Sequence, residues 1–257
     1  MNILLLGDVV SESGCAFVRR RLPALKRLYG IDLCLANAEN SAKGNGVTPE
    51  SARFLFSSGV DALTLGNHAF RRREVYGFLD ETEAIVRPFN YPAGAPGRGV
   101  AVLDLGRVRV AVINLMGTTW LDALDNPFSA AKEALKQTGD ARIVLVDFHA
   151  EATSEKRAMG FFLDGRVSAV YGTHTHVQTS DAQVLPGGTG YITDLGMCGV
   201  KDSVLGVKKE IVLEKFRTCL PVRFDTAEEG DCVLEGCVLD IDEKSGYCRS
   251  AAAVRIE

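Results

Sequence analysis

The sequence of 257 residues predicts an α/β fold. Short runs rich in β-branched residues and leucine alternate with helix-like stretches through the first two thirds of the chain. This rhythm is typical of βαβ units around a largely buried sheet. The composition is that of an ordinary globular protein, with 46% hydrophobic and 24% charged residues. The expected strands span residues 2–7, 31–37, 60–65, 100–105, 108–115, 142–148 and 167–171.

Helix signals lie between several of these strands. After the first strand, apolar residues recur at helical spacing, at Val18, Leu22, Leu25 and Leu28. Thr48-Pro49 and Asn126-Pro127 each place a capping residue before a proline, and proline is favoured at the first position of a helix. Helices are therefore expected to begin at residues 49 and 127.

The last third of the chain changes character. Residues 208–216 predict one more helix, and 219–226, 231–241 and 247–256 predict short strands with a hairpin loop at 242–246. No linker-like stretch precedes these strands. We therefore expect residues 219–256 to be an antiparallel addition to a second sheet, and residues 1–257 to form a single domain.

Charge and cysteine usage restrict the function. The net charge is −4, so the composition offers no basic surface for duplex nucleic acid, and a small anionic substrate would need local positive charge such as a metal ion. Seven cysteines form an odd set without a CxxC pair, which suits a reducing compartment. With neither a signal peptide nor an apolar run long enough to cross a membrane, the expected location is cytoplasmic.

The positions of the histidines are the main indication of the chemistry. There are only four, and each lies at or just beyond the carboxyl end of an expected strand: His68, His149, His174 and His176. Two further strands end on carboxylates, at Asp8 and at Glu39-Asn40. Open α/β sheets place ligand sites at that edge, so the sequence predicts a metal site there. A single histidine of this kind would more often be a turn or core residue, but five such strand ends together favour ligands.

The kinds of ligand restrict the metal. Imidazole, carboxylate and amide oxygen together suit Fe, Mn or Zn better than calcium. His174 and His176 are separated by one residue, so in an extended segment they would point the same way, roughly 7 Å apart. That separation suits two different ions roughly 3.5–4 Å apart.

These motifs resemble a known superfamily. Asp8, Glu39-Asn40, Gly66-Asn67-His68, His149 and the run GTHTH at 172–176 resemble the calcineurin-like metallophosphoesterases. The stretches DFHAEATSEK (147–156), GTHTHVQT (172–179) and LPVRF (220–224) are more narrowly similar to the YmdB-type 2′,3′-cyclic-nucleotide phosphodiesterases. The resemblance covers nearly the whole chain and implies a four-layer α-β-β-α sandwich.

Two positions depart from the wider superfamily, and both match the narrower family. The usual Asp-x-His motif is Asp8-Val9-Val10 here, and Glu39 replaces the usual bridging aspartate. The resemblance implies that Asp8, Asn40 and His176 hold a first ion, that Glu39 bridges, and that Asn67, His149 and His174 hold a second. It implies that His68 is the general acid and not a ligand.

The implied activity is hydrolysis of 2′,3′-cyclic nucleotides at a dinuclear centre. A hydroxide bridging two divalent or mixed-valence ions, Fe or Mn by preference, would attack phosphorus in line. His68 would protonate the departing ribose oxygen. A phosphomonoesterase or a 3′,5′-cyclic phosphodiesterase on the same centre, and a regulatory protein that binds without turnover, remain alternatives. A homo-oligomer also remains open.

Some motifs stay ambiguous. Arg71-Arg72-Arg73 follows His68 and is interpreted either as a solvated helix face or as a group that attracts phosphate. The second interpretation stays open because arginines at the start of a helix oppose its dipole. Lys43-Gly44-Asn45-Gly46 lacks the spacing of a nucleotide-binding loop and predicts a turn. Specificity is expected to lie in loops such as 87–99 and 117–127.

Overall fold

The first strand shows how the sequence builds the layers. In the computed structural model, which describes residues 1–257, β1 (Asn2–Val10) has alternate side chains on opposite faces. Leu4 and Leu6 pack into one apolar cluster and Ile3 and Leu5 into another, and all four are buried. A strand with both faces apolar must be covered on both sides.

β1 lies at the centre of a seven-stranded sheet with the order β13-β12-β11-β1-β2-β3-β4. β2 and β11 flank β1 in parallel, whereas β12 runs antiparallel to it. The other strands of this sheet are β2 (Leu33–Asn40), β3 (Ala62–Thr64), β4 (Ile85–Val86), β11 (Met197–Val200), β12 (Cys232–Ile241) and β13 (Cys248–Ile256).

A second sheet of six strands has the order β5-β6-β7-β8-β10-β9. Its central strands β6, β7, β8 and β10 are parallel, and β5 and β9 close its edges antiparallel. The strands are β5 (Val100–Asp104), β6 (Arg109–Met116), β7 (Ile143–His149), β8 (Ala169–Thr173), β9 (Gln183–Val184) and β10 (Gly190–Ile192).

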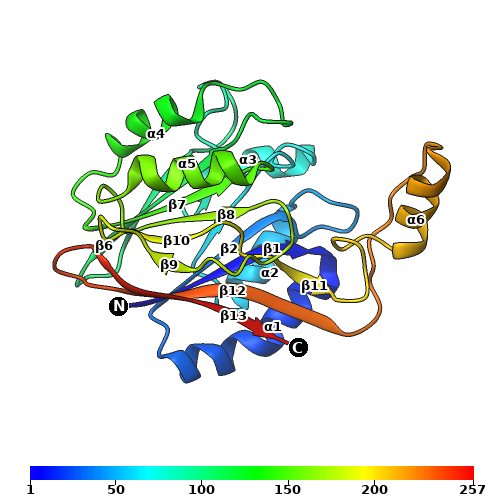
Figure 1. The fold of residues 1–257 in the computed structure, drawn as a ribbon, viewed down its shortest axis with the longest axis horizontal. Helices are drawn as coiled ribbons and strands as arrows, with labels where there is room; N and C mark the ends of the chain where they lie inside the picture. Colours follow the sequence, from blue (N-terminus) through cyan, green and yellow to red (C-terminus); the bar gives the residue numbers. More distant parts are fainter.

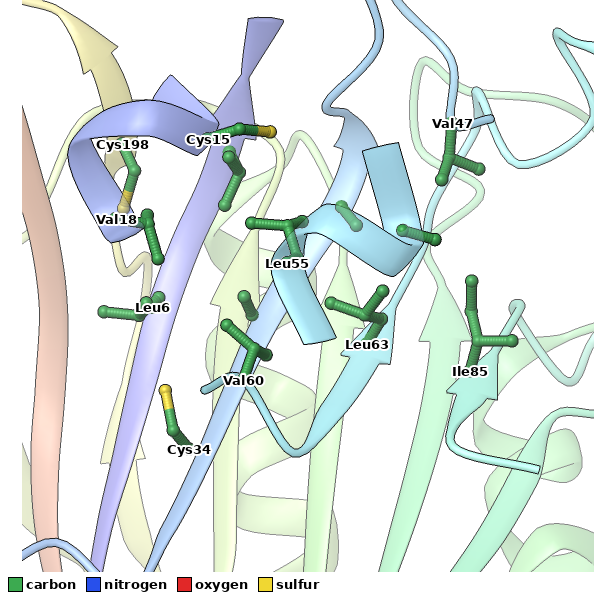
Figure 2. Close-up of a cluster of buried hydrophobic side chains, with 14 of the residues drawn as sticks. Leu6, Cys15, Val18, Cys34, Val47, Leu55, Val60, Leu63, Ile85 and Cys198 are labelled. Carbon is green, nitrogen blue, oxygen red and sulfur yellow. The ribbon is translucent and has the colours of Figure 1, made fainter. Parts of the chain in front are cut away.

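Helices cover the outer faces of both sheets. α1 (Ser11–Tyr29) and α2 (Pro49–Ser57) pack on the first sheet, where Val18 and Leu55 meet Leu6 and Leu63 (Figure 2). α4 (Pro127–Leu135) and α5 (Thr153–Leu163) cover the second sheet (Figure 1). A middle cluster joins the two sheets face to face. The predicted four-layer α-β-β-α sandwich is therefore confirmed.

Only one of the remaining helices lies apart from these layers, because Val75 and Leu79 of the other two are buried in the cluster that covers the first sheet. η1 (Arg73–Val75) and α3 (Tyr76–Glu81) follow β3, and α6 (Lys209–Thr218) projects from one end of the molecule (Figure 1). The capping predictions are confirmed, because Thr48 forms a capping box with Ser51 and Asn126 accepts hydrogen bonds from two amides of α4. In α1, Leu28 is exposed, so the predicted apolar stripe ends at Leu25.

The C-terminal region corrects two predictions. Residues 219–226 do not form a strand: only Thr226 makes a bridge, to Val207, although the apolar alternation of this run matches a strand. The strands at 231–241 and 247–256 do form, but they extend the sheet that contains β1, not a second one. β12 pairs with Asn2–Leu6 of β1, so the two ends of the chain share one sheet.

Candidate metal centre

The predicted ligands come together where the two sheets meet at their carboxyl edges. Asp8 lies near the end of β1, Glu39 and Asn40 end β2, and His149 ends β7. The other predicted ligands lie in the loops after β3 and β8, and they are Asn67, His174 and His176; the predicted general acid His68 follows Asn67 directly. Because β7 and β8 belong to one sheet and β1, β2 and β3 to the other, the site joins both sheets.

Glu39 contacts two histidines of this cluster. Its side chain is buried, and its Oε1 atom lies 3.4 Å from His149 Nε2 and 3.1 Å from His68 Nδ1. Its other oxygen, Oε2, accepts a hydrogen bond of 2.8 Å from the His68 amide. The carboxylate thus reaches both the buried histidine and the one beside the solvent.

A tight group of possible ligand atoms surrounds His149 Nε2. Asn67 Oδ1 lies 2.9 Å away and His174 Nδ1 lies 3.1 Å away. Ligand atoms of Glu39, His149 and His174 all lie within 4.8 Å of one another. Three groups with lone pairs thus converge on the same ring nitrogen.

A second group forms around Asp8, which is fully buried. His176 Nε2 lies 3.6 Å from Asp8 Oδ1, and Asn40 Nδ2 lies 3.3 Å from the same ring nitrogen. Asp8 Oδ2 accepts a hydrogen bond of 2.9 Å from the His174 amide, whereas Oδ1 is buried without any hydrogen-bond partner. The side-chain oxygen of Asn40, Oδ1, lies 3.0 Å from His68 Nδ1. A 180° rotation of the side-chain amide would turn this oxygen toward His176 instead.

The ring nitrogens facing away from the centre fix the histidine tautomers. Thr173 donates its hydroxyl hydrogen to Asp147, so it accepts from His149 Nδ1–H at 2.9 Å and leaves Nε2 with a lone pair toward the site. His174 Nε2–H faces Glu151 at 3.0 Å, and His176 Nδ1–H donates to the Leu205 carbonyl at 2.9 Å.

His68 has the opposite arrangement. Its Nδ1 faces the buried Glu39 and Asn40, while its Nε2 has no hydrogen-bond partner in the protein. The side chain is 31% exposed and lies on the wall of a cavity. His68 therefore presents a nitrogen to whatever the cavity holds, and the other three histidines present theirs to the centre.

Neighbouring charges and burial shift the pKa values of the groups in this cluster. Burial would raise the pKa of Asp8, but the His176 ring outweighs it and holds the pKa below its ordinary value. Burial would lower the pKa of His176, but Asp8 raises it to about 9. Burial, with the His149 ring beside it, lowers the pKa of His174 to about 3, so this imidazole is neutral and able to act as a ligand.

These observations fit a metal centre. Two buried carboxylates, Asp8 and Glu39, require positive charge that the protein supplies only by protonating histidines. The unpartnered Asp8 Oδ1 and the lone pairs converging on His149 Nε2 are groups that a cation would satisfy. Nitrogen and oxygen ligands of this kind suit Fe, Mn or Zn.

The loop after β8 differs from the prediction. His174 and His176 were expected in an extended segment, but the strand ends at Thr173 and both residues have positive φ, of 102° and 61°. Backbone of this kind is costly for residues other than glycine and is characteristic of functional sites. The two rings therefore reach the centre through a bent loop.

Several supporting residues were missed by the sequence analysis. Under His149 lies a buried polar network in which Asp147 accepts from Thr64, Thr173 and Asn37. The role of Asp147 could have been predicted from the sequence, because Asp147 stands two residues before His149 and so lies on the same face of the strand. Glu151, on an exposed loop, gave no such signal.

The centre opens into a cavity of about 520 Å³. Asp8 and His149 lie beneath its surface with 0% exposure, and Asn67, His68, His174 and His176 line it. None of the lining residues comes from 87–99 or 117–127, the loops in which specificity was expected to lie. The walls come instead from residues 44–45, 205–207 and 224–226.

The fold is shared with a class of solved proteins. The chain superposes on the NAD nucleotidase of Haemophilus influenzae with a TM-score of 0.60 at 13% identity, covering 99% of this chain and 55% of that one. Identity this low speaks only for the fold, which is that of the metallophosphoesterases.

The family follows from closer relatives. The model of the YmdB-like protein family matches residues 4–254, and the chain belongs to this family. It is 45% identical to the 2′,3′-cyclic-nucleotide 2′-phosphodiesterase of Bacillus subtilis over 100% of this chain and 96% of the relative. A crystal structure of a hypothetical protein from Thermus thermophilus has a TM-score of 0.93 at 43% identity, covering 100% of this chain and 99% of that one. The chain is thus an enzyme of the phosphoesterase type.

The helices are short or polar relative to what a bilayer demands. None combines the length and the apolar character that crossing a membrane requires.

Proposed function

We propose that this chain is a dinuclear metal-dependent phosphodiesterase that hydrolyses 2′,3′-cyclic nucleotides, with His68 as general acid. The observation that carries the proposal is the contrast between three histidines whose free nitrogens face the buried centre and one, His68, whose free nitrogen faces the cavity. The name of the Bacillus subtilis relative supports the substrate class.

In this proposal each ion has its own set of ligands. Asp8, Asn40 and His176 would hold the first, Asn67, His149 and His174 the second, and Glu39 would lie between them. The convergence around His149 Nε2 supports the second set, and the unpartnered Asp8 oxygen supports the first. Two divalent or mixed-valence ions, Fe or Mn by preference, would acidify water and offset negative charge on phosphate oxygens when bound.

His68 supplies the proton in this scheme. A water oxygen bonds to phosphorus as the water loses one proton to solvent, the bond from phosphorus to one ribose oxygen breaks, and His68 Nε2–H donates a proton to that oxygen. Solvent then returns a proton to His68. The product is a phosphomonoester with a free hydroxyl. Glu39 fixes the ring through Nδ1, which aims Nε2 at the leaving group without further ordering.

The experiment is metal analysis paired with turnover. We expect about two ions per chain in protein purified without chelator, and hydrolysis of 2′,3′-cyclic AMP in preference to 3′,5′-cyclic AMP and to phosphomonoesters. If the protein binds two ions but hydrolyses another class of phosphoester, the metal centre stands and the substrate must be reassigned to that class. Protein that binds no metal after incubation with Mn or Fe would overturn the proposal.

We also propose that residues 1–257 act as one metallophosphoesterase domain. The pairing of β12 with β1 and β11 supports this, because removing residues 219–256 would expose one edge of the central strand. A single unfolding transition by calorimetry is expected. Two separate transitions would contradict it.

A further inference from the structure

A second cavity, of about 900 Å³, adjoins the metal centre. The two cavities share four wall residues, Gly44, Asn45, Phe224 and Asp225. The second is basic: Lys43, Arg71, Arg72 and Arg223 line it, and Asp225 is its only acidic residue. Three segments that are far apart in the sequence bring these cations together.

Most of this positive charge is uncompensated. Asp225 is already paired with Lys208, and Lys43, Arg71 and Arg223 are exposed and form no ion pair. Only Arg72 has a structural task, because its guanidinium donates to the carbonyls of Lys43 and Asn45 and so holds the turn that separates the cavities. Like charges gathered around a cavity repel one another and favour an anion between them.

We propose that the substrate is a single-stranded RNA end, with its terminal 2′,3′-cyclic phosphate at the metal centre and its preceding phosphate in the second cavity. This rests on the function proposed above. A cyclic mononucleotide has one phosphate, which the metal centre engages, so it leaves the basic cavity without a ligand. An oligonucleotide has another phosphate on the 5′ oxygen of the same terminal nucleoside.

Phe224 gives a second reason for a polynucleotide. Its ring is 48% exposed on the wall shared by the two cavities, and Lys215 Nζ lies 4.7 Å from its centroid. Exposed aromatic rings beside cations are the usual stacking platforms for single-stranded nucleic acid. The patch is local on a chain of net charge −4, so it suits a single strand in a groove and not a duplex on a basic face.

The test compares three substrates: 2′,3′-cyclic AMP, the same nucleotide with a 5′-phosphate, and a short oligoribonucleotide ending in a 2′,3′-cyclic phosphate. We expect kcat/KM to be about tenfold or more higher for the oligonucleotide at low salt, and to fall more steeply with salt. In Arg71→Ala/Arg223→Ala the ratio between oligonucleotide and 2′,3′-cyclic AMP should fall toward one. The matched control, Arg27→Ala/Arg142→Ala, removes the same charge at exposed sites outside both cavities and should keep the ratio.

A binding measurement separates this inference from the proposed function. Fluorescence anisotropy with an oligoribonucleotide ending in a 3′-phosphate needs no turnover, and its affinity should fall in the Arg71/Arg223 variant and not in the control. Failure to hydrolyse 2′,3′-cyclic AMP, with this binding intact, would refute the function but not the site. Equal kcat/KM for oligonucleotide and mononucleotide would refute the RNA substrate, and so would a full gain from the 5′-phosphate alone.

Discussion

Lys156 Nζ lies 2.6 Å from Asp194 Oδ2, and both side chains are buried. The same Asp194 oxygen accepts a hydrogen bond of 3.1 Å from the Thr175 amide, between the two loop histidines. Its other oxygen accepts one of 2.9 Å from Gly196. This ion pair therefore anchors the bent loop that presents His174 and His176 to the metal centre.

Removing the lysine should destabilise the protein strongly. In Lys156→Met, Asp194 keeps a buried charge without its cation, so the free energy of unfolding should fall by about 3–5 kcal/mol. Denaturant unfolding measures this. Lys136→Met is the control, because its pair with Glu133 is exposed and worth about 0.5 kcal/mol or less. Equal losses in the two variants would show that the buried pair is not essential.

Replacing His68, the proposed general acid, should separate chemistry from metal binding. In His68→Asn we expect about two ions per chain to remain, while turnover of 2′,3′-cyclic AMP falls by about 10²–10⁴-fold. An ester with a good leaving group, such as bis-p-nitrophenyl phosphate, needs less protonation and should lose less. Elemental analysis and kinetics with both substrates check this. An emptied metal site in the variant would contradict the role.

Gly66 is required for space and not for backbone freedom. A Cβ atom there would lie 2.2 Å from His149 Nε2, so Gly66→Ala should displace that ring and reduce metal content toward one ion per chain. Gly94→Ala is the control, because a Cβ at Gly94 meets nothing within 4 Å. Unchanged metal content in Gly66→Ala would mean that His149 does not bind the second ion.

The hairpin between β12 and β13 should respond to acid. Asp242 accepts hydrogen bonds of 2.8 Å from the amides of Ser245 and Lys244, and with Arg249 they lower its pKa to about 2. Because the folded-state pKa is below the unfolded one, the stabilisation is complete above about pH 5 and is lost as the pH falls toward about 2.

The measurement compares the wild-type chain with Asp242→Ala. The difference in their free energies of unfolding should narrow between about pH 5 and pH 2.5. A constant difference over this range would show that the carboxylate charge does not hold the turn.

The gathering of several proposed ligands was predictable because of a general property of sheets. Parallel strands bring their carboxyl ends to one edge, so the polar residues after Leu6 and Ala38, on neighbouring strands of one sheet, had to lie close together, whereas His149 after Phe148 reaches them from the other sheet. The strands at 231–241 and 247–256 were also predictable from their pattern, but their partner was not. Which sheet they join depends on the pairing of β12 with β1, a contact between the two ends of the chain.

The rest depended on contacts that sequence patterns do not contain. The run 219–226 alternates like a strand, yet Leu220 and Phe224 remain exposed and no neighbouring strand accepts its backbone. The basic cavity could not be seen for a similar reason. Arg71 belonged to an ambiguous motif, Lys43 to a simple turn and Arg223 to a supposed strand, and only the folded chain joins them.

The unpartnered Asp8 oxygen has a thermodynamic consequence. Ions that bind the folded chain and not the unfolded one stabilise it by linkage, about 2.7 kcal/mol for each site at a free concentration 100 times its dissociation constant. A carboxylate oxygen buried without a donor makes the metal-free state costly. We expect the chelated protein to melt at a lower temperature and to be cut more readily by proteases, so that metal supply governs the abundance of the enzyme as well as its activity.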